Sequence, residues 1–340
     1  MTKTDIPTIS HSQVSLWREC EQRWTYRYGQ RLVPKRIERP LHLGSWVHAA
    51  LEAHYKYGNW RRGHKVYLAD YNKLFEEEKL RLDKGKSQKK SMDRADYEPL
   101  PSQVERIIRS YIWYYEKNTA TRRVEKTIAV EVEYHLPRDG YVQHGVIDRI
   151  YEDEDGLKWV QDHKVWDDIP LTEGTLHTVD PQLTIYLEGA KEALGIEAAG
   201  VEYNYVRSAA PSFPIQNLDR SLSKKDVATD YPTAFRWLKE NGYDPAQYSD
   251  LLLPLMGTSP FLRRHRLPRN ELVTTRVLED FDRSATEIVG HDAAVRNIGR
   301  HCDWCPYQTI CRNELYGMST KALRDMNFEI EDKSKRKKVV

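Results

Sequence analysis

The stretch from Gly145 to Lys164 reads GVIDRIYEDEDGLKWVQDHK and predicts two neighbouring strands of a central sheet. The runs GVIDRIYE and LKWVQDHKVW are strand-like, and an acidic turn at 153–156 joins them. A turn this short makes the two strands antiparallel neighbours. Side chains alternate along a strand, so Asp162 and Lys164 share a face and His163 points to the other. Asp148 can then lie beside Asp162.

Two adjacent carboxylates repel each other unless a cation lies between them, and hard oxygen ligands at an open edge suit Mg2+ or Mn2+. Lys164 could orient an attacking water or stabilise charge on a phosphate. The same three residues also suit a solvent-facing hairpin whose lysine is a surface ion-pair partner. These three residues alone do not favour a metal site over a solvent-facing hairpin, and only the other motifs of the chain do so.

Working outward, strands are expected at about 127–136, 141–152, 157–166 and 200–208, with a helix at about 181–194 that Gly195 closes. This order predicts an α/β fold with a mixed central sheet flanked by helices, in which the helix is a crossover on one face. Gln182 and Tyr186 lie one turn apart on that helix and alone would be a packing pair.

Two helices are expected near the N-terminus. The first, capped by Ser10 or Ser12, places Cys20 on its apolar side, where a core cysteine is an ordinary occupant. After a linker at 34–40, the second helix stacks Gly44, His48 and Glu52 on one face. A histidine on a helix is usually packed or at the surface, so His48 becomes a candidate ligand only if a metal lies nearby.

The segment HCDWCPYQTIC contains Cys302, Cys305 and Cys311 in a C-x2-C-x5-C pattern. Three thiols this close together indicate a metal centre, and Cys20 is the remaining cysteine that could complete four ligands. Zinc and an iron-sulfur cluster both accept four thiolates, although the distant fourth ligand would be unusual for zinc. Either metal would join the two ends of the chain and stabilise the fold.

Composition limits the alternatives. The 340 residues carry 53 basic and 51 acidic side chains, so a nucleic-acid surface must be local. A basic stretch could be that surface or a solvated loop, with Trp60 and Tyr67 as candidates for base stacking; it comprises Arg61, Arg62, Lys65, Lys84, Lys86, Lys89 and Lys90. The alternative strand path is the run RRHRLPR within a region at about 211–268 that is expected to be irregular apart from a helix near 231–240. No apolar run has membrane-spanning length and the N-terminus lacks a signal-peptide core, so a cytoplasmic protein is expected.

Taken in order, these motifs resemble the PD-(D/E)xK nuclease superfamily, and specifically its RecB-like branch with a four-cysteine iron-sulfur cluster, which includes the AddB nuclease domain and the CRISPR-associated exonucleases. Cys20 is similar to the lone N-terminal cluster ligand, and 44–48 to the G-x-x-x-H helix. Further similarities are Asp148 in GVID, the D/E-x-K motif at 162–164, the Q-x-x-x-Y motif at 182–186, and the triplet Cys302, Cys305 and Cys311. Ile147 stands where the superfamily's proline would precede Asp148.

The resemblance implies a restriction-endonuclease-like core and roles for its residues. His48, Asp148, Asp162 and the backbone carbonyl of His163 would hold Mg2+ or Mn2+, and Lys164 would position the nucleophilic water. Gln182 and Tyr186 would line the strand's path or support Lys164. Cys20, Cys302, Cys305 and Cys311 would hold a [4Fe-4S] cluster.

A single nuclease domain is then expected over 1–325, followed by a basic disordered tail at 326–340. Its segments are an N-terminal part at 1–43, a helical region at 44–125, the catalytic core at 126–210, an irregular and helical region at 211–290 and the cysteine segment at 291–318. The implied function is a DNA exonuclease acting on single-stranded ends in recombination, repair or phage DNA metabolism, with a helicase or recombinase as partner. The alternatives are a non-catalytic DNA-end-binding scaffold that keeps the metal centre and a zinc-stapled structural protein.

Overall fold

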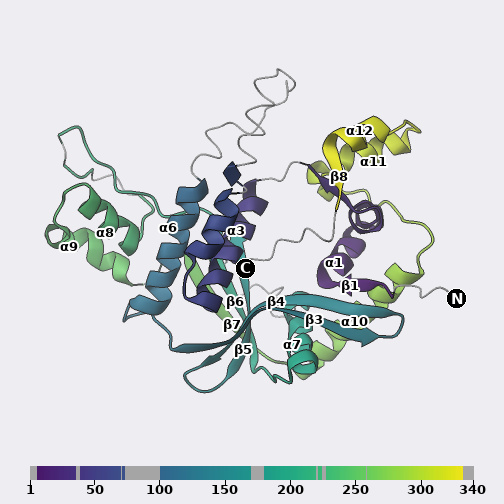
Figure 1. Cartoon of the computed structure of the whole chain (residues 1–340), viewed down its shortest axis with the longest axis horizontal. Coiled ribbons are helices and arrows are strands. Elements are labelled where there is room, and N and C mark those ends of the chain that lie inside the picture. Colours follow the sequence, from purple (N-terminus) through teal and green to yellow (C-terminus); the bar gives the residue numbers. More distant parts are fainter. Residues whose placement is uncertain are drawn as a thin grey trace.

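The computed structural model describes residues 6–35, 39–69, 71–72, 100–169, 180–219, 221–223, 227–257 and 259–331. A mixed sheet lies at the centre, with helices on both sides of it (Figure 1). This confirms the predicted fold class. No helix in these ranges is long and apolar enough to cross a membrane.

The sheet has the order β1-β4-β5-β6-β7, and β3 pairs with β4 beside this path. Its strands are β1 (Thr8–Ser10), β3 (Glu125–Arg138), β4 (Tyr141–Asp153), β5 (Lys158–Trp166), β6 (Gly200–Arg207) and β7 (Leu262–Pro268). The pairs β1 with β4 and β5 with β6 are parallel, whereas β3 with β4, β4 with β5 and β6 with β7 are antiparallel. The sheet is therefore mixed, as the order of predicted elements required.

The acidic turn forms the predicted hairpin between β4 and β5. Asp153 Oδ1 accepts hydrogen bonds from the amides of Asp155 (3.2 Å) and Leu157 (3.0 Å). Gly156 has a φ of +77°, which a residue with a side chain rarely adopts. The turn chemistry therefore holds β4 and β5 in the antiparallel arrangement that the sequence predicted.

Helices that lie far apart in the sequence cover the sheet. The long ones are α3 (Arg39–Tyr57), α6 (Leu100–Ile112), α7 (Pro181–Leu194) and α10 (Glu271–Gly290). α3 and α6 pack on each other through an apolar core that includes Trp46 and Ile108. α7 packs Leu183 and Leu187 against the sheet, where they meet Val160.

Side chains cap the first turns of α7 and α10, and Gly195 ends α7 as expected. The Asp180 side chain accepts from the amide of Gln182 at the start of α7, and Gly195 ends the helix with a φ of +65°. The Asn270 side chain accepts from the amide of Val273 at the start of α10. These caps satisfy backbone groups that have no partner within the helix.

Segments from the two ends of the chain form one side of the molecule (Figure 1). They comprise α1 (His11–Glu19), α2 (Glu21–Trp24), a π-helix (Thr25–Gly29), β2 (Leu32–Pro34), a 3-10 helix (Arg300–Trp304), α11 (Gln308–Leu315), α12 (Lys321–Asn327) and β8 (Phe328–Ile330). β2 pairs antiparallel with β8, and the Tyr307 hydroxyl donates to the Leu32 carbonyl at 2.7 Å. The expected disordered tail is therefore wrong for 326–331, because Phe328 is buried and the backbone around it completes this small sheet. Residues 332–340 lie outside the described part.

The region at 211–268 contains the expected helix, and outside that helix it is more regular than expected. It contains α8 (Tyr231–Glu240), a 3-10 helix (Pro245–Tyr248), α9 (Ser249–Leu252), a second 3-10 helix (Leu253–Met256) and β7. The run RRHRLPR, a candidate strand path, lies largely in β7, where Arg264 is buried and pairs with Glu125 at 2.6 Å. A buried, paired arginine cannot bind a DNA backbone, so this alternative is wrong for Arg264. A π-helix (Trp113–Lys117) extends α6.

Candidate active site

A cleft of about 610 Å³ lies where α3, β4, β5 and α7 meet. Its lining includes the side chains that the four motifs without cysteine singled out: His48, Asp148, Asp162, Lys164, Gln182 and Tyr186. Gly44 and Glu52 of α3 also line it. Residues from four separate elements thus converge on one cavity large enough for part of a polymer.

The acids are joined through the backbone of β5. The pairing of β4 with β5 runs from Glu152–Lys158 to Arg149–Gln161 and ends before Asp148. The Asp148 side chain therefore reaches across the gap, and its Oδ2 accepts the amide N–H of His163 at 2.7 Å. His48 Nδ1 lies 3.5 Å from the same oxygen.

The His163 side chain points away from the cleft, as alternation requires. Its ring stacks on Tyr55 of α3 with centroids 6.1 Å apart, and Asn204 Nδ2 donates to its Nδ1 at 2.6 Å. Burial holds the pKa of His163 well below its ordinary value. Its backbone amide donates to Asp148, while its buried ring packs between Tyr55 and His48.

A chain of hydrogen bonds holds Lys164. Its Nζ lies 2.8 Å from Asp162 Oδ2 and donates to Gln182 Oε1 at 2.8 Å. Gln182 Nε2 in turn donates to the Tyr186 hydroxyl at 2.9 Å. Of the two roles that the resemblance implied for Gln182 and Tyr186, these contacts favour support of Lys164.

The charges in the cleft favour the binding of a cation. Burial, and then the Asp148 carboxylate, raise the pKa of Asp162 to about 6. Asp162 Oδ2 is buried, and among the described residues no group hydrogen bonds to it with good geometry beyond the nearby Lys164 ammonium. Burial lowers the pKa of Lys164, but the Asp162 and Asp148 carboxylates outweigh this and raise it, so the lysine stays charged. The carboxylate oxygens of Asp148 and Asp162, with the His48 imidazole beside them, fit a divalent cation.

Glu131 is a residue of the cleft that the sequence analysis missed. It lies on β3 between the pairs Val130–Arg149 and Val132–Ile147, and therefore faces Asp148. Its φ of +50° is unusual for a residue with a side chain, and β3 has a register shift shortly before it. Burial, followed by the carboxylates of Asp148 and Glu52, raises the pKa of Glu131 to about 8. The available signal was the alternation of acids in AVEVEY beside the strand of Asp148.

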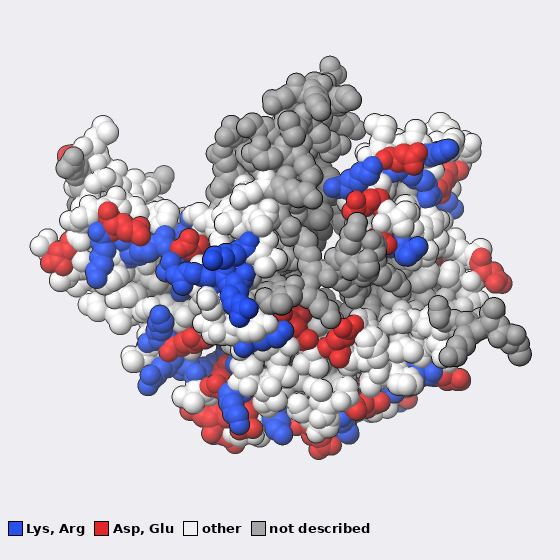
Figure 2. Space-filling view, viewed as in Figure 1, with Lys and Arg blue, Asp and Glu red and all other residues white. Residues whose placement is uncertain are grey.

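The candidate strand path is only partly described. Arg61, Arg62 and Lys65 are exposed, whereas Lys84, Lys86, Lys89 and Lys90 lie outside the described residues. Trp60 is only 7% exposed and packs in the core of α3 and α6, so the expectation that it stacks on bases is wrong. Tyr67 lines the cleft. Lys and Arg side chains gather over α6 and α8 (Figure 2), which gives a local positive surface on a nearly neutral chain.

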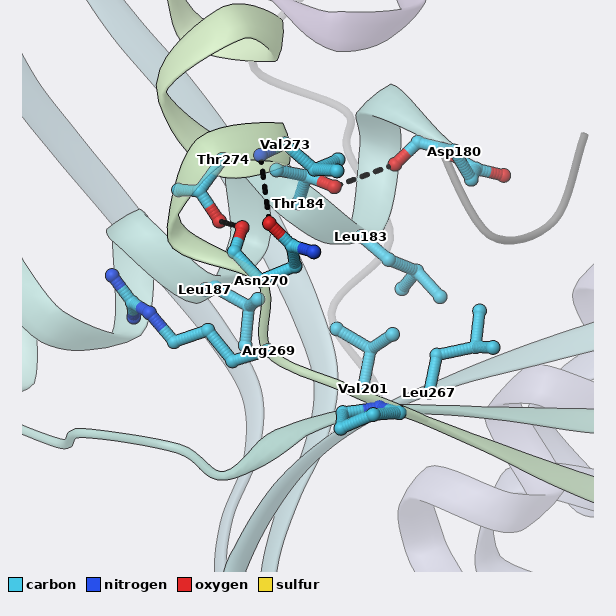
Figure 3. A pocket seen from close by; sticks show the side chains of 11 residues that line it. Asp180, Leu183, Thr184, Leu187, Val201, Leu267, Arg269, Asn270, Val273 and Thr274 are labelled. Carbon is cyan, nitrogen blue, oxygen red and sulfur yellow. Dashed lines mark hydrogen bonds between the residues drawn. The ribbon is translucent and has the colours of Figure 1, made fainter.

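A second cavity, of about 30 Å³, lies between α7 and the start of α10 (Figure 3). Thr184 Oγ1 donates to the Asp180 carbonyl, and Thr274 Oγ1 donates to the Asn270 carbonyl, so the polar groups drawn there are engaged in capping. This volume holds about one or two water molecules. The cavity is therefore a packing defect between helices rather than a substrate site.

The four cysteines lie in the part of the molecule formed by both chain ends. Cys20 separates α1 from α2, and its extended backbone ends the first helix. Burial raises the pKa of the Cys305 thiol, and the neighbouring thiols of Cys20 and Cys302 add to this. Cys305 and Cys311 pack beside Tyr26 and Tyr307. The fold therefore brings Cys20 to the C-terminal triplet, although hydrogen bonds and β2–β8 pairing also join these segments.

The chain is similar to two solved structures and to one family model. A crystal structure of a proposed exonuclease from Eubacterium rectale is similar over 88% of each chain, with 12% identity and a TM-score of 0.44. SSO0001 is similar over 92% of this chain and 88% of its own, with 13% identity and a TM-score of 0.30. No curated relative matches the sequence. The family model of the PD-(D/E)XK nuclease superfamily matches residues 8–312, which contain the cleft and all four cysteines, and the chain belongs to this superfamily.

Proposed function

We propose that the protein is a divalent-metal-dependent DNA exonuclease that hydrolyses phosphodiester bonds from single-stranded ends. Membership of the nuclease superfamily supports phosphodiester hydrolysis and a divalent metal. The observation that carries the proposal is the convergence of Asp148, Asp162 and a fixed Lys164 in one open cleft. The choice of single-stranded ends rests on the resemblance to the RecB-like branch.

In this proposal Asp148, Asp162, His48 and the His163 carbonyl hold the metal ion. A bound Mg2+ or Mn2+ supplies charge for the scissile phosphate and lowers the pKa of a coordinated water. Lys164 is fixed by Asp162 and Gln182, so its ammonium can orient the water or stabilise the developing negative charge. Tyr186 acts one step further away, through the Gln182 amide.

The competing proposal is a DNA-end-binding scaffold without catalysis. A scaffold would have no need for a lysine held between a carboxylate and an amide, or for a buried acid beside a second carboxylate. Retention of the complete set in the cleft therefore favours the enzyme.

We further propose that Cys20, Cys302, Cys305 and Cys311 bind a [4Fe-4S] cluster. Burial and, after it, the neighbouring thiols of Cys20 and Cys302 raise the pKa of the Cys305 thiol, which supports a shared site for these cysteines. The choice of a cluster over zinc rests on the resemblance to the RecB-like branch, in which each of four thiolates binds a different iron atom. Brown protein with a band near 400 nm would support the cluster, and colourless protein with stoichiometric zinc would exclude it.

The biological setting follows from the same proposal. The four cysteines form no disulfide, which fits a reducing compartment, and we infer a cytoplasmic location. An exonuclease for single strands needs DNA that has been opened, so a helicase or recombinase in recombination, repair or phage DNA metabolism is the proposed partner.

The test of the enzyme is digestion of DNA by paired variants. Asp148→Ala and Asp162→Ala should each abolish cleavage with Mg2+ or Mn2+, because the metal loses a ligand from a preformed site. Glu154→Gln, which removes a carboxylate from the exposed turn of the same hairpin, should leave cleavage unchanged. Substrates are end-labelled single- and double-stranded DNA and a single-stranded circle. Wild-type turnover in either aspartate variant would refute the assignment, and cleavage of the circle would refute exonuclease action.

A further inference from the structure

A cluster of three metal-ligating side chains lies on the β3–β4 hairpin, outside the set that lines the cleft. Glu133 and His135 are on β3, and His144 is on β4. His135 lies directly opposite His144, and Glu133 lies opposite Val146. Residues directly opposite one another, and residues two apart on one strand, project from the same face of a sheet. The three side chains therefore rise together from one patch of the hairpin.

The distances between their donor atoms fit a small ion. One ring nitrogen of each histidine and one carboxylate oxygen of Glu133 all lie within 4.8 Å of one another. Glu133 Oε1 is 3.7 Å from His135 Nε2 and 3.8 Å from His144 Nδ1. On a tetrahedral zinc ion with bonds of about 2.0–2.1 Å, two ligand atoms lie about 3.3–3.4 Å apart. Small side-chain movements would bring the three donors to an ion.

In this cluster one side chain is held in place and the other two are exposed to solvent. His144 is the anchored ligand, because its side chain is only 11% exposed. Its Nδ1, the nitrogen near Glu133, also lies 3.3 Å from the Tyr134 carbonyl, so a metal ion bound at Nδ1 would replace this contact. The side chains of His135 and Glu133 are about half exposed, at 53% and 50%, so solvent can supply the remaining ligands. The two imidazoles stack with centroids 4.7 Å apart, which would be unfavourable if both rings were protonated.

We propose that Glu133, His135 and His144 form a binding site for a divalent transition-metal ion of the Zn2+ type. Two imidazoles and one carboxylate suit Zn2+, and not Mg2+ or Ca2+, which prefer oxygen ligands. In the described part of the chain, no other group of three His, Cys, Asp or Glu side chains has donor atoms this close together. Because the ligands come from two strands, the ion would join β3 to β4. Val146, one same-face step from His144, lines the cleft, so this ion would lie beside the cleft wall.

The proposal is independent of nuclease activity and is tested by metal binding. The full-length protein, with its cysteine centre filled and in excess Mg2+, is titrated with Zn2+ in a calorimeter. One Zn2+ should bind to the wild type, and His135→Ala and His144→Gln should each abolish this binding. Glu133→Gln should weaken it about tenfold or more. Glu154→Gln, the matched loss of an exposed carboxylate, should leave it unchanged.

Two further measurements separate this site from the others. The same titration of Asp162→Asn should still show the event, because Asp162 belongs to the cleft. Co2+ bound in place of Zn2+ should give weak d–d absorption without thiolate charge-transfer bands, because the ligands contain no sulfur. Thermal melts without Zn2+ establish that the His135→Ala and His144→Gln variants fold. Unchanged Zn2+ binding in both histidine variants, loss of the event in Asp162→Asn, or thiolate bands with Co2+ would each overturn the proposal.

Discussion

Lys164 is the residue whose position most depends on its neighbours. A lysine side chain is flexible, and its ammonium is useful in a cleft only if other groups fix it. Asp162 contacts the ammonium from the same strand, and Gln182 approaches from α7. Because Tyr186 accepts from the Gln182 amide nitrogen, the amide oxygen is left to face the lysine.

Gln182→Leu should therefore slow turnover while leaving the metal requirement unchanged. A hydrogen bond to a charged group contributes about 1.5–3 kcal/mol, which corresponds to a roughly 10- to 150-fold loss in kcat. Tyr186→Phe should cost less, since Lys164 keeps both direct partners. Lys191→Gln, an exposed change on the same helix, is the control. Steady-state cleavage across a Mg2+ titration checks this, and a raised metal requirement with unchanged kcat would assign Gln182 to the metal site instead.

The raised pKa of Glu131 predicts that the stability of the folded protein depends on pH. Its pKa of about 8 in the folded protein lies above its unfolded value of about 4.3. The folded state thus keeps a proton that the unfolded chain has lost, and the stability from this group falls as pH rises from about 4.3 to about 8. In metal-free protein, Glu131→Gln should be more stable than the wild type, by a margin that grows with pH, and Mg2+ should narrow the margin. Urea unfolding at several pH values, with and without Mg2+, measures it; a margin that stays constant with pH would contradict the raised pKa.

For individual residues, the sequence predicted most of the cleft because the patterns that place their side chains are periodic. Alternation along β5 places Asp162 and Lys164 together, and helical spacing aligns Gly44, His48 and Glu52. Glu131 was not predicted as a cleft residue, because a register shift and a positive φ decide where its side chain points. Neither feature has a periodic pattern in the sequence. The roles of all these residues stay predictions until the variants are measured.

Among the elements, α7 lies close to the sheet because two glycines face Tyr134. A Cβ atom on Gly189 of α7 would lie 2.5 Å from the Tyr134 ring, and one on Gly145 of β4 would lie 2.4 Å from its hydroxyl. Real side chains do not approach this closely, so the ring or the helix would have to move. The position of Gln182 in the cleft therefore depends on a glycine two turns further along the same helix.

Gly189→Ala should destabilise the protein by about 1–3 kcal/mol, the usual cost of overpacking a core, and should lower turnover because α7 shifts. Gly290→Ala, at the end of α10, adds a Cβ that meets nothing within 4 Å and serves as the control. Denaturant unfolding and cleavage assays on both variants check this. If Gly189→Ala matched the control in both assays, Tyr134 would have to be more mobile than its packing indicates.

Elements with strong local signals were predictable, and those that depend on distant partners were not. α7 carried a capping Asp, a proline and a terminal Gly, and its bounds match the expectation. β7 was missed because arginines are poor indicators of a strand. Arg264 becomes a strand residue only through Glu125 and Tyr111, which lie more than 100 residues away in the sequence. β1 has three residues, too few for a periodic pattern.

Across the whole molecule, the joining of the two chain ends makes distant cysteines equivalent. Cys20→Ser should lower iron content and thermal stability as severely as Cys305→Ser, because a cluster that loses one of four thiolates is labile and its binding energy is linked to folding. Ser15→Ala, on the exposed side of α1, should change neither quantity. Iron analysis, absorbance near 400 nm and thermal melts test this. Full iron and stability in Cys20→Ser would show that Cys20 is a packed core cysteine.

The pairing of β2 with β8 also determines when this part of a newly synthesised chain can fold. A ribosome makes β2 (Leu32–Pro34) about 300 residues before its partner β8 (Phe328–Ile330). About 290 residues separate Cys20 from Cys311, which takes roughly 15–60 s at about 5–20 residues per second. During that interval the first cysteine has none of its three companions, and the sheet fragment next to it has no second strand. Chains that stop before Phe328 lack β8, so β2 has no partner strand in them and this small sheet cannot form.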